Sequence, residues 1–420
     1  MNFEDLTLIS PLLRAVREEG YDRPTPIQQK TILHVLEGRD ILGCAQTGTG
    51  KTAAFALPIL QRLLKTRAPE PGRVRVLVLS PTRELTSQIG DSFTRYGRHT
   101  AVRCTTMFGG VSQQRQVRAL RKGVDVLVAT PGRLIDLMQQ KIARLNRVEI
   151  LVLDEADRML DMGFIHDVRR IISSLPRKRQ TLFFSATLPH DITTLARDIL
   201  YRPIRVEVAP PATTVETISQ SLYRVEKREK FVLLARLLQD TALQRVLIFT
   251  RTKRGANKLA EYLNRNSIRA NAIHGNKGQS ARERALASFK RGACRVLVAT
   301  DIASRGIDVD DITHVVNFDL PNVPECYVHR IGRTARAGAK GSAITFCSIA
   351  ERKELAAVER VIGTRIPQRQ VPHGIIRAGA PSVPANGASR PPQHRSPTQR
   401  PRRAVSYGRF SPGRGRRSRP

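Results

Sequence analysis

The chain has 420 residues, more than one hydrophobic core normally serves, so its length predicts two globular domains of roughly 150 to 200 residues each. Its formal net charge is +35, with 71 lysines and arginines against 36 acidic residues, which indicates a nucleic-acid partner, for an enzyme or for a structural protein of the ribosome. The start MNFEDLTL is polar, and no apolar run approaches the roughly 18 residues of a membrane span, which argues against a secreted or membrane-spanning protein. The cysteines are scattered without C-x-x-C spacing, so we expect them to be reduced and the protein to be cytoplasmic.

Short apolar runs recur along the first half of the chain: RVRVLVL ending at Leu79, VDVLVAT ending at Thr130, VEILVL ending at Leu153 and TLFF ending at Phe184. Such runs are typical of parallel strands that are buried on both faces. Helical patterns lie between the strands, and in the second half apolar residues share a helical face at Phe231, Leu234, Ala235 and Leu238, and at Ala256, Leu259, Ala260 and Leu263. This alternation predicts an α/β fold with parallel sheets.

Two strand-like strings occur twice at the same separation. VLVLSPTR begins at Val76 and VLVAT at Val126, while VLIFTRTK begins at Val246 and a second VLVAT at Val296. Both pairs are 50 residues apart, which favours two copies of one fold over a chance recurrence of apolar strings. Because the run APPATTVET is proline-rich and nearly uncharged, we expect a first domain at 1–209, a linker at 210–217 and a second domain at 218–367.

The alternating pattern stops after about Pro367, and residues 368–420 are expected to form a disordered arm. From Val371 onward the chain has 11 arginines, many prolines, and neither lysine nor acid, so +24 of the total charge stays on the rest of the chain. The planar guanidinium group suits phosphate binding and base stacking. The dominance of arginine therefore favours a nucleic-acid contact over a merely solubilising tail.

The stretch AQTGTGKT matches the phosphate-loop pattern G-x-x-x-x-G-K-[ST] except at its first position, Ala45. It follows the strand-like DILGC and precedes the helical TAAFALPIL, so backbone N–H groups at the turn can face a phosphate. Lys51 is expected to reach the outer phosphates and Thr52 to ligate Mg²⁺. The Lys-Thr pair at the end of the motif disfavours the alternative, a glycine-rich turn that binds no nucleotide. The expected ATP contacts are Ala45, Gln46, Thr47, Gly48, Thr49, Gly50, Lys51 and Thr52.

The run LVLDEAD places Asp154 and Glu155 at the carboxyl end of a strand, the edge where parallel sheets present their ligand sites. Two adjacent acids there are costly without a cation. We expect Asp154 to hold Mg²⁺ through water, and Glu155 to orient and deprotonate the water that attacks the phosphate. A solvated acidic turn is the alternative from this stretch alone, and the phosphate loop upstream disfavours it.

Several motifs together give the chain a family resemblance. DEAD at 154–157, SAT at 185–187 and HRIGRTARAG at 329–338 resemble the DEAD-box RNA helicases. The similarity covers roughly residues 1 to 365 in the family's motif order, which makes the joint match far more specific than any one motif. The resemblance implies two tandem RecA-like domains that face each other across a cleft, with ATP between them and single-stranded RNA bound across both.

The N-terminal GYDRPTPIQ resembles the family's adenine-reading motif. The resemblance implies that Gln28 pairs with the adenine edge, since an amide both donates and accepts, and that Phe3 and Tyr21 support this contact. ATP is therefore expected to be preferred over GTP. Taken alone, Gln28 would be interpreted as a turn residue and Phe3 as a core residue.

The second domain is expected to complete the ATP site. The resemblance makes Arg333 and Arg336 arginine fingers against the γ-phosphate, where charge builds up during phosphoryl transfer, and places Asp308 at the ribose. Hydrolysis would then require the two domains to close. The alternative for the two arginines is a simple grip on RNA phosphates.

The RNA contacts implied by the resemblance are small, hydroxyl-bearing or cationic residues at strand ends, which suit a sugar-phosphate backbone better than base edges. In the first domain they are Pro81, Thr82, Arg83, Gly109, Gly110, Thr130, Pro131, Gly132 and Arg133, and in the second Thr250, Arg251, Gln279, Arg282, Thr300 and Asp301. Sequence specificity should be slight. Any one of them, taken alone, is equally well an ordinary loop residue.

Ser185 and Thr187 are expected to couple ATP-site closure to RNA remodelling, as in relatives, although a Ser and a Thr at a strand end are equally well helix caps. Two positions depart from the family pattern. Thr86 stands where Ala is common, and Ala335 stands where Gly is common. Neither change removes a reacting group.

The expected function is an ATP-dependent RNA helicase in which domain closure bends the bound strand and separates short duplexes locally. An ATP-gated RNA clamp, a DNA translocase and an RNA annealer driven by the arginine arm fit the same sequence features. The short N-terminal segment, the string HGNKGQ at 274–279 and the basic arm most resemble the bacterial RhlE group. Ribosome assembly, RNA decay and cold adaptation are the implied roles, with ribosomal precursors or an RNA-decay complex as partners.

Overall fold

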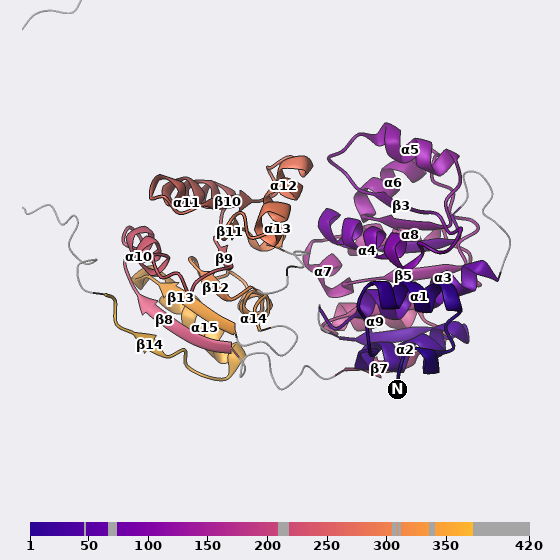
Figure 1. Ribbon diagram of the computed structural model, residues 1–420, viewed down its shortest axis with the longest axis horizontal. Helices are drawn as coiled ribbons and strands as arrows, with labels where there is room; N and C mark the ends of the chain where they lie inside the picture. The colour runs from indigo at the N-terminus through magenta and orange to yellow at the C-terminus, as the bar shows by residue number, and fades with distance from the viewer. Residues whose placement is uncertain are drawn as a thin grey trace, which may run out of the picture. The chain divides into compact units, whose positions relative to one another are not determined.

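The computed structural model describes residues 1–45, 48–65, 74–208, 218–304, 309, 312–335 and 341–372. Two parallel sheets of seven strands organise these residues, one before and one after the expected linker (Figure 1). The linker itself, and the arm from residue 373 onward, lie outside the described residues. The chain is thus an α/β protein with two copies of one sheet, as its pattern of buried strands predicts.

The first sheet has the strand order β3-β4-β2-β5-β6-β1-β7, with every pairing parallel. Strands β2, β4, β5 and β6 are buried along their whole length, which explains why their sequences are apolar at successive positions. The strands are β1 (Ile41–Cys44), β2 (Val76–Leu79), β3 (Cys104–Met107), β4 (Val126–Ala129), β5 (Ile150–Leu153), β6 (Gln180–Ser185) and β7 (Ile204–Glu207).

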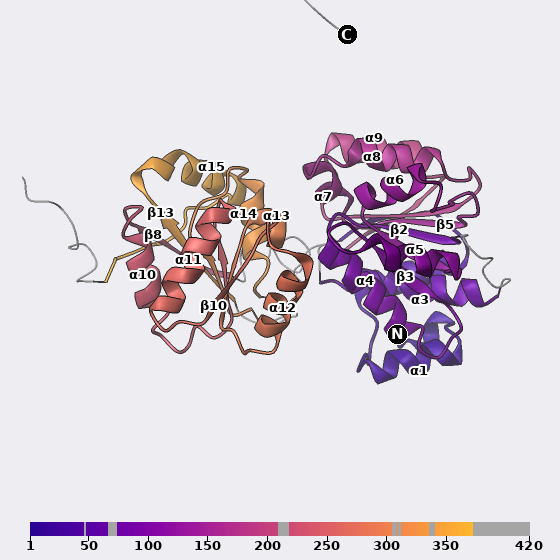
Figure 2. The same ribbon diagram turned by 90° about the horizontal axis from the view of Figure 1, so that it is seen from above.

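Two helical layers cover this sheet, one on each face (Figure 2). The helices of one layer are η1 (Glu4–Leu6), α1 (Ser10–Glu18), α2 (Pro26–Leu36), α3 (Lys51–Leu64) and α4 (Arg83–Tyr96). Those of the other are α5 (Gln113–Arg121), α6 (Pro131–Gln139), α7 (Ala156–Asp161), α8 (Ile165–Ser173) and α9 (His190–Ile199). Since both faces are covered, the polar ligands of any site must lie at the ends of the strands.

The second sheet repeats this plan, with the order β10-β11-β9-β12-β13-β8-β14. Its strands are β8 (Ile218–Arg224), β9 (Val246–Phe249), β10 (Ala270–Ile273), β11 (Val296–Ala299), β12 (His314–Asn317), β13 (Gly341–Cys347) and β14 (Gln368–Arg369). Its helices are α10 (Lys230–Leu237), α11 (Lys253–Arg265), α12 (Gln279–Lys290), α13 (Asp301–Ser304), α14 (Glu325–Ile331), η2 (Ile349–Glu351) and α15 (Arg352–Ile362).

The repeated strings of the sequence are the matching strands of the two sheets. Val76 is directly opposite Val126 in the pairing of β2 with β4, and Val246 is directly opposite Val296 in the pairing of β9 with β11. The equal spacing of the two string pairs therefore reflects the same register in both sheets. This confirms that the chain contains two copies of one fold.

Three smaller points follow from the described residues. The two-residue strand β14 pairs with β8 at the start of the range expected as arm, so regular structure extends past Pro367. All five cysteines are free thiols, with Cys294 and Cys347 buried and the other three partly buried. Among the described helices, none combines the length and the apolar character that a bilayer crossing requires.

Candidate nucleotide and RNA sites

The phosphate loop joins β1 to α3, and its backbone adopts a conformation that requires glycine. Gly48 and Gly50 have φ angles of 87° and 90°. A Cβ atom on Gly50 would lie 2.5 Å from Nε2 of Gln28, which donates a hydrogen bond of 3.1 Å to the Gly50 carbonyl. The backbone N–H of Thr25 in turn donates to Oε1 of Gln28 at 2.9 Å. The glutamine of the adenine-reading motif is therefore fastened to the phosphate loop.

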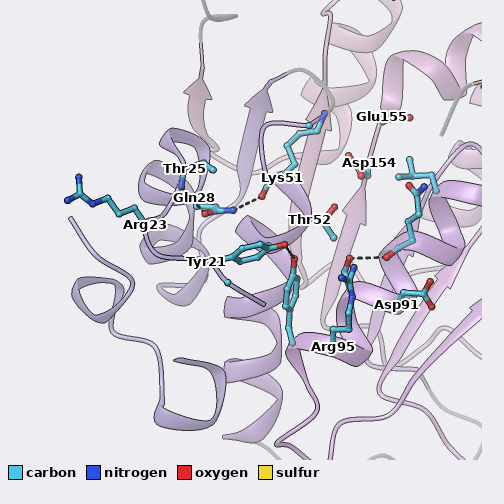
Figure 3. A pocket seen from close by; sticks show the side chains of 18 of the residues that line it. Tyr21, Arg23, Thr25, Gln28, Lys51, Thr52, Asp91, Arg95, Asp154 and Glu155 are labelled. Atoms are coloured by element: carbon cyan, nitrogen blue, oxygen red, sulfur yellow. Dashed lines mark hydrogen bonds between the residues drawn. The ribbon is translucent and has the colours of Figure 1, made fainter. Parts of the chain in front are cut away.

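A cavity of about 640 Å³ opens beside this loop, within the ordinary range for a ligand site (Figure 3). Lys51 is buried, and its Nζ donates a hydrogen bond of 2.7 Å to the Ala45 carbonyl. Gln46 and Thr47 lie outside the described residues. Predicted residues that line the cavity are Tyr21, Gln28, Gly48, Gly50, Lys51, Thr52, Asp154 and Glu155.

The two acids of the cavity differ in their partners. Oδ1 of Asp154 is buried and has no hydrogen-bond partner among the described residues, and burial raises the pKa of this carboxyl to about 6, with Lys51 acting in the opposite direction. Oε2 of Glu155 lies 2.5 Å from Nη1 of Arg158, and Glu155 has a left-handed φ of 54°. A strained backbone at a buried acid is typical of a functional position.

These residues fit a magnesium ion better than a zinc or calcium ion. In the part of the chain that the structure describes, no group of three or more His, Cys, Asp or Glu side chains lies in position to bind a metal. Mg²⁺ usually needs only one or two carboxylates, because water and substrate phosphates supply its other ligands. The carboxylate of Asp154 and the hydroxyl of Thr52, which line the same cavity, match that requirement.

The DEAD and SAT motifs are joined by direct hydrogen bonds. Oδ2 of Asp157 accepts from the Thr187 backbone at 2.9 Å, from the Thr187 hydroxyl at 3.1 Å and from the Ala186 backbone at 3.2 Å. The hydroxyl of Ser185 accepts from the Asp157 backbone at 3.2 Å and donates to the Thr187 carbonyl at 2.7 Å. Ser185 and Thr187 therefore lie against the turn that carries Asp154 and Glu155.

The side of the cavity near Tyr21 contains residues that sequence reasoning missed. The hydroxyls of Tyr21 and Tyr96 lie 3.2 Å apart, and Tyr96 is buried at the end of α4. Other missed lining residues of α4 are Gln88, Asp91, Ser92 and Arg95. Phe3, by contrast, is buried in the core and does not line the cavity. It borders a separate hollow that Tyr21 also borders.

The predicted RNA motifs of the first domain converge at the same sheet edge. A cavity of about 300 Å³ is bordered by Pro81, Thr82, Arg83, Gly109, Thr130, Gly132 and Arg133. These residues follow β2, β3 and β4, three neighbouring strands whose carboxyl ends meet there. Gly110 follows Gly109 in the same turn, and Pro131 is the first residue of α6.

The cations of this cavity are held in place by their neighbours. A Cβ atom on Gly110, whose φ is 80°, would lie 1.9 Å from Nη1 of Arg83, so a larger residue there would displace that guanidinium. Burial lowers the pKa of Arg83. Nη1 of Arg133 donates to Oε1 of Gln116 at 3.1 Å, and Nε2 of Gln116 donates to the Phe108 carbonyl at 2.9 Å. Gln116 is a further residue that sequence reasoning missed.

In the second domain, the predicted RNA residues lie at the matching edge of the second sheet. Thr250 and Arg251 follow β9, Thr300 and Asp301 follow β11, and Gln279 and Arg282 lie in the first turn of α12. The carboxylate of Asp301 accepts two hydrogen bonds from Arg330, at 2.6 and 2.7 Å. The backbone N–H of Arg251 donates to Asp319 at 2.9 Å.

The expected arginine fingers are only partly described. Arg333 follows α14, and its Nε donates to the His329 carbonyl at 3.3 Å. Asp308 and Arg336 lie outside the described residues. Arg330 of the same motif is buried. It donates to Asn317 and to the Asp319 carbonyl and lies over the Phe249 ring, so it binds the strand ends of its own domain together.

Both departures from the family pattern have a structural counterpart. The buried Thr86 hydroxyl lies 2.7 Å from that of Ser80 and donates to the Thr82 carbonyl at 2.9 Å, so the extra polar group is satisfied. Ala335 has a φ of 56°, a conformation that glycine adopts without strain.

Comparisons with known proteins agree with this geometry. The family model for DEAD/DEAH box helicases matches residues 25–195, and the model for the helicase conserved C-terminal domain matches residues 229–338. The DEAD-box ATP-dependent RNA helicase CshA of Bacillus cereus is 43% identical over 370 residues, which is 88% of this chain and 70% of that protein. CshA of Bacillus subtilis is 42% identical over 372 residues, 89% of this chain and 74% of that protein.

Solved structures extend the likeness to three dimensions. Dbp5 of S. cerevisiae bound to RNA and ADP BeF3 has a TM-score of 0.77 at 30% identity, covering 88% of this chain and 96% of that one. Mss116p bound to ssRNA and AMP-PNP has a TM-score of 0.78 at 28% identity, covering 88% and 79%. With two RecA-like domains, the family's motifs at the expected strand ends and relatives of this similarity, the chain belongs to the DEAD-box ATP-dependent RNA helicases, enzymes that hydrolyse ATP.

Proposed function

We propose that Lys51, Thr52, Asp154 and Glu155 form the catalytic centre. Lys51 contacts the outer phosphates, Thr52 and Asp154 hold Mg²⁺, and Glu155 orients and deprotonates the attacking water. When bound, Mg²⁺ neutralises charge on the transferred phosphoryl group. The observation that carries this proposal is Oδ1 of Asp154, a buried carboxylate oxygen without a described partner in the cavity that Lys51 also lines.

The adenine and RNA contacts are proposed from the same two cavities. Gln28 and Tyr21 contact the base, since both line the nucleotide cavity, whereas Phe3 supports them from the core. RNA binds through its backbone at the first-domain cavity around Arg83 and Arg133 and at the matching strand ends of the second domain. The cationic and hydroxyl-bearing character of these residues supports binding with little sequence preference.

Closure of the two domains is proposed to complete the ATP site with Arg333, Arg336 and Asp308 and to bend the bound RNA, which separates short duplexes locally. The hydrogen bonds from Asp157 to Thr187 and Ser185 support a coupling role for the SAT motif, because they tie it to the turn that carries the catalytic acids. The Dbp5 and Mss116p structures hold RNA together with an ATP analogue, which supports simultaneous binding here.

ATP turnover with RNA, with DNA and without nucleic acid tests this proposal. We expect RNA to stimulate turnover well above the other two conditions. Glu155→Gln should lower the RNA-stimulated rate by about 10²- to 10⁴-fold, the usual contribution of a general base, while ATP still binds. Glu261→Gln, which changes an exposed acid of α11, is the matched control and should leave the rate unchanged. Full turnover by Glu155→Gln would show that Glu155 is not the base.

The same preparations separate unwinding from the alternatives. A helicase separates a short duplex on ATP addition, a clamp instead shows long RNA residence with little separation, and an annealer driven by the arm forms duplexes without ATP.

We further propose a cytoplasmic RhlE-like protein that acts on ribosomal precursors or in RNA decay, supported by the string HGNKGQ and the basic arm. The relatives named above are CshA proteins, so this subgroup assignment rests on those sequence features alone.

A further inference from the structure

Basic residues precede every strand of the first sheet. Because all seven strands are parallel, their first residues lie at one edge, which we call the amino edge. The phosphate loop, the DEAD motif and the RNA motifs all follow strand ends, so they lie at the opposite edge. The amino edge is therefore separate from the sites described above.

The exposed cations of the amino edge form a row when they are taken in the order of the strands. Arg103 precedes β3, Arg121 and Lys122 precede β4, and Arg144 and Arg147 precede β5. All five side chains are exposed. Between them, before β2, lies Arg75, which is buried.

The row continues on the other side of β5. Arg177 and Lys178 precede β6, Arg39 precedes β1 and Arg202 precedes β7, and all four are exposed. Neighbouring strands lie about 4.8 Å apart, so the seven strand starts extend over roughly 29 Å. That length accommodates several nucleotides of a single strand.

The acids of the amino edge offset only part of this row. Both carboxylate oxygens of Asp40 accept backbone hydrogen bonds at 2.8 Å, from Thr181 and Tyr201. Asp125 and Glu149 pair with the buried Arg75, at 3.4 and 2.9 Å. In the part of the chain that the structure describes, none of the nine exposed cations named above pairs with a carboxylate. The amino edge therefore presents a concentrated positive charge to solvent.

An exposed aromatic ring stands at one end of the row. Tyr201 is 74% exposed, and the guanidinium of Arg202 lies 5.4 Å from its ring centroid. The Tyr201 backbone is held in place, because its N–H donates a hydrogen bond to Oδ2 of Asp40. Exposed rings beside a track of cations are the usual means by which proteins bind single-stranded nucleic acid, through base stacking on the ring and phosphate contacts along the track.

We infer that the amino edge of the first sheet is a second RNA-binding surface, which holds single-stranded RNA that flanks the segment bound at the opposite edge. The chain's own arm cannot fill this surface, since it contains no acid after Val371. An acidic protein would be expected to meet a compact patch with apolar anchors at its centre. A row dominated by arginine, with a ring at its end, fits a phosphate backbone better.

The test uses the full chain and two variants of equal charge. The edge variant is R144Q/R147Q/R177Q/K178Q, whose four side chains are exposed and make no hydrogen bond or ion pair with the described residues. The control variant is K227Q/R228Q/R265Q/K353Q, which removes four exposed cations of the second domain. The affinity for single-stranded RNA of about 10 and about 40 nucleotides, lengths on either side of a typical single-strand site, is measured over a range of salt concentrations.

We expect the edge variant to bind the long RNA about tenfold more weakly than the wild type. Its slope of log K against log[salt] should be smaller in magnitude by one to three units, since each phosphate contact on a single strand contributes about 0.7 to that slope. The control variant should keep the wild-type slope. Short-RNA affinity and ATP turnover with short RNA should stay at wild-type values in both variants, which separates this surface from the catalytic proposal. RNA carrying 4-thiouridine should crosslink to Tyr201 in the long-RNA complex.

Three results would overturn the inference. One is wild-type affinity and salt slope in the edge variant, and another is an equal loss in both variants, which would indicate a general effect of net charge. The third is that the wild type binds poly-glutamate and the edge variant does not, while both bind the long RNA equally well. That result would indicate an acidic polypeptide as the partner. Matching thermal unfolding of the three proteins excludes misfolding as the cause of a loss.

Discussion

Asp154 is a buried acid whose ionised form is disfavoured by its burial. Its carboxylate is completely buried, and burial raises its pKa to about 6 from the 3.8 of a free aspartate side chain. Lys51 offsets only part of that cost. In the nucleotide-free protein this carboxylate should therefore lower the stability of the fold at neutral pH, as strained and costly groups at functional sites commonly do.

Asp154→Asn should stabilise the nucleotide-free protein at pH 8 by about 3 kcal/mol, because it removes a buried charge. The folded state binds a proton at this carboxyl more tightly than the unfolded state. The destabilisation therefore grows as the pH rises from about 4 through about 6, and the gain from the substitution should vanish at pH 4.

Denaturant unfolding at several pH values, without nucleotide or magnesium, measures this difference. Glu261→Gln serves as the control and should show no pH-dependent gain, because Glu261 is exposed. A gain for Asp154→Asn that is equal at pH 4 and pH 8 would argue that it comes from packing and not from the carboxylate's charge.

Sequence reasoning found the residues whose signal is local and missed those whose partners are distant. The phosphate loop and the DEAD motif are contiguous strings, so their chemistry follows from the order of residues. Tyr96 meets Tyr21 from 75 positions away, and Asp157 meets Thr187 from 30 positions away. Phe3 was assigned to the nucleotide contact through family resemblance, whereas its burial matches the core role that its residue type alone suggests.

At the level of elements, the sequence signal was clearest for strands that are buried along their whole length, namely β2, β4, β5, β6, β9 and β11. The repeated spacing of two pairs among them carried the register of both sheets. Strand β14 was not predictable, since two exposed residues, Gln368 and Arg369, carry no such signal. The conformation of Ala335 was also beyond reach. The sequence shows an alanine where the family pattern commonly has glycine, but only the backbone shows that this residue is left-handed.

Ala335→Gly should raise the free energy of unfolding by about 0.5 to 1 kcal/mol. Removing the steric strain of an alanine in the left-handed conformation stabilises the folded state by about 1 to 2 kcal/mol. The greater freedom of glycine in the unfolded chain offsets part of this gain. The backbone at Ala335 is closely packed against Gly341, because a Cβ atom on Gly341 would lie 2.7 Å from the Ala335 backbone nitrogen.

Chemical denaturation of the full chain tests this expectation. Ala356→Gly is the matched control, since Ala356 is an exposed residue within α15, and it should lower stability by about 1 kcal/mol. If Ala335→Gly lowered stability by a similar amount, the turn would not be strained in the way its φ angle indicates.

For the whole molecule, the proposed division of labour is that the first domain binds ATP and the second supplies the cations needed for its cleavage. Each domain has its own sheet and its own hydrophobic cores, so each has the packing needed to fold as a unit. The phosphate loop and both proposed catalytic acids belong to the first, whereas Arg333 and Arg336 belong to the second.

A fragment of residues 1–209 should bind ATP yet fall at least about 10²-fold below the RNA-stimulated turnover of the full chain, because arginine fingers contribute about 10³ to 10⁵ in comparable enzymes. The full chain carrying R333A/R336A should show a similar deficit, and R360A, at an exposed position of α15, should not. Steady-state phosphate release measures all three. Turnover by the fragment at the full chain's rate would refute the division.

The matching order of the two sheets also bears on how many ATP molecules one chain binds at a time. Strand β8 holds in the second sheet the place that β1 holds in the first, between β13 and β14 as β1 lies between β6 and β7. Yet β1 leads into AQTGTGKT, whereas β8 leads into VEKREK, which has neither glycine nor the Lys-Thr ending. The second sheet therefore keeps the strand order of the first but lacks its phosphate loop, and we expect one bound ATP per chain.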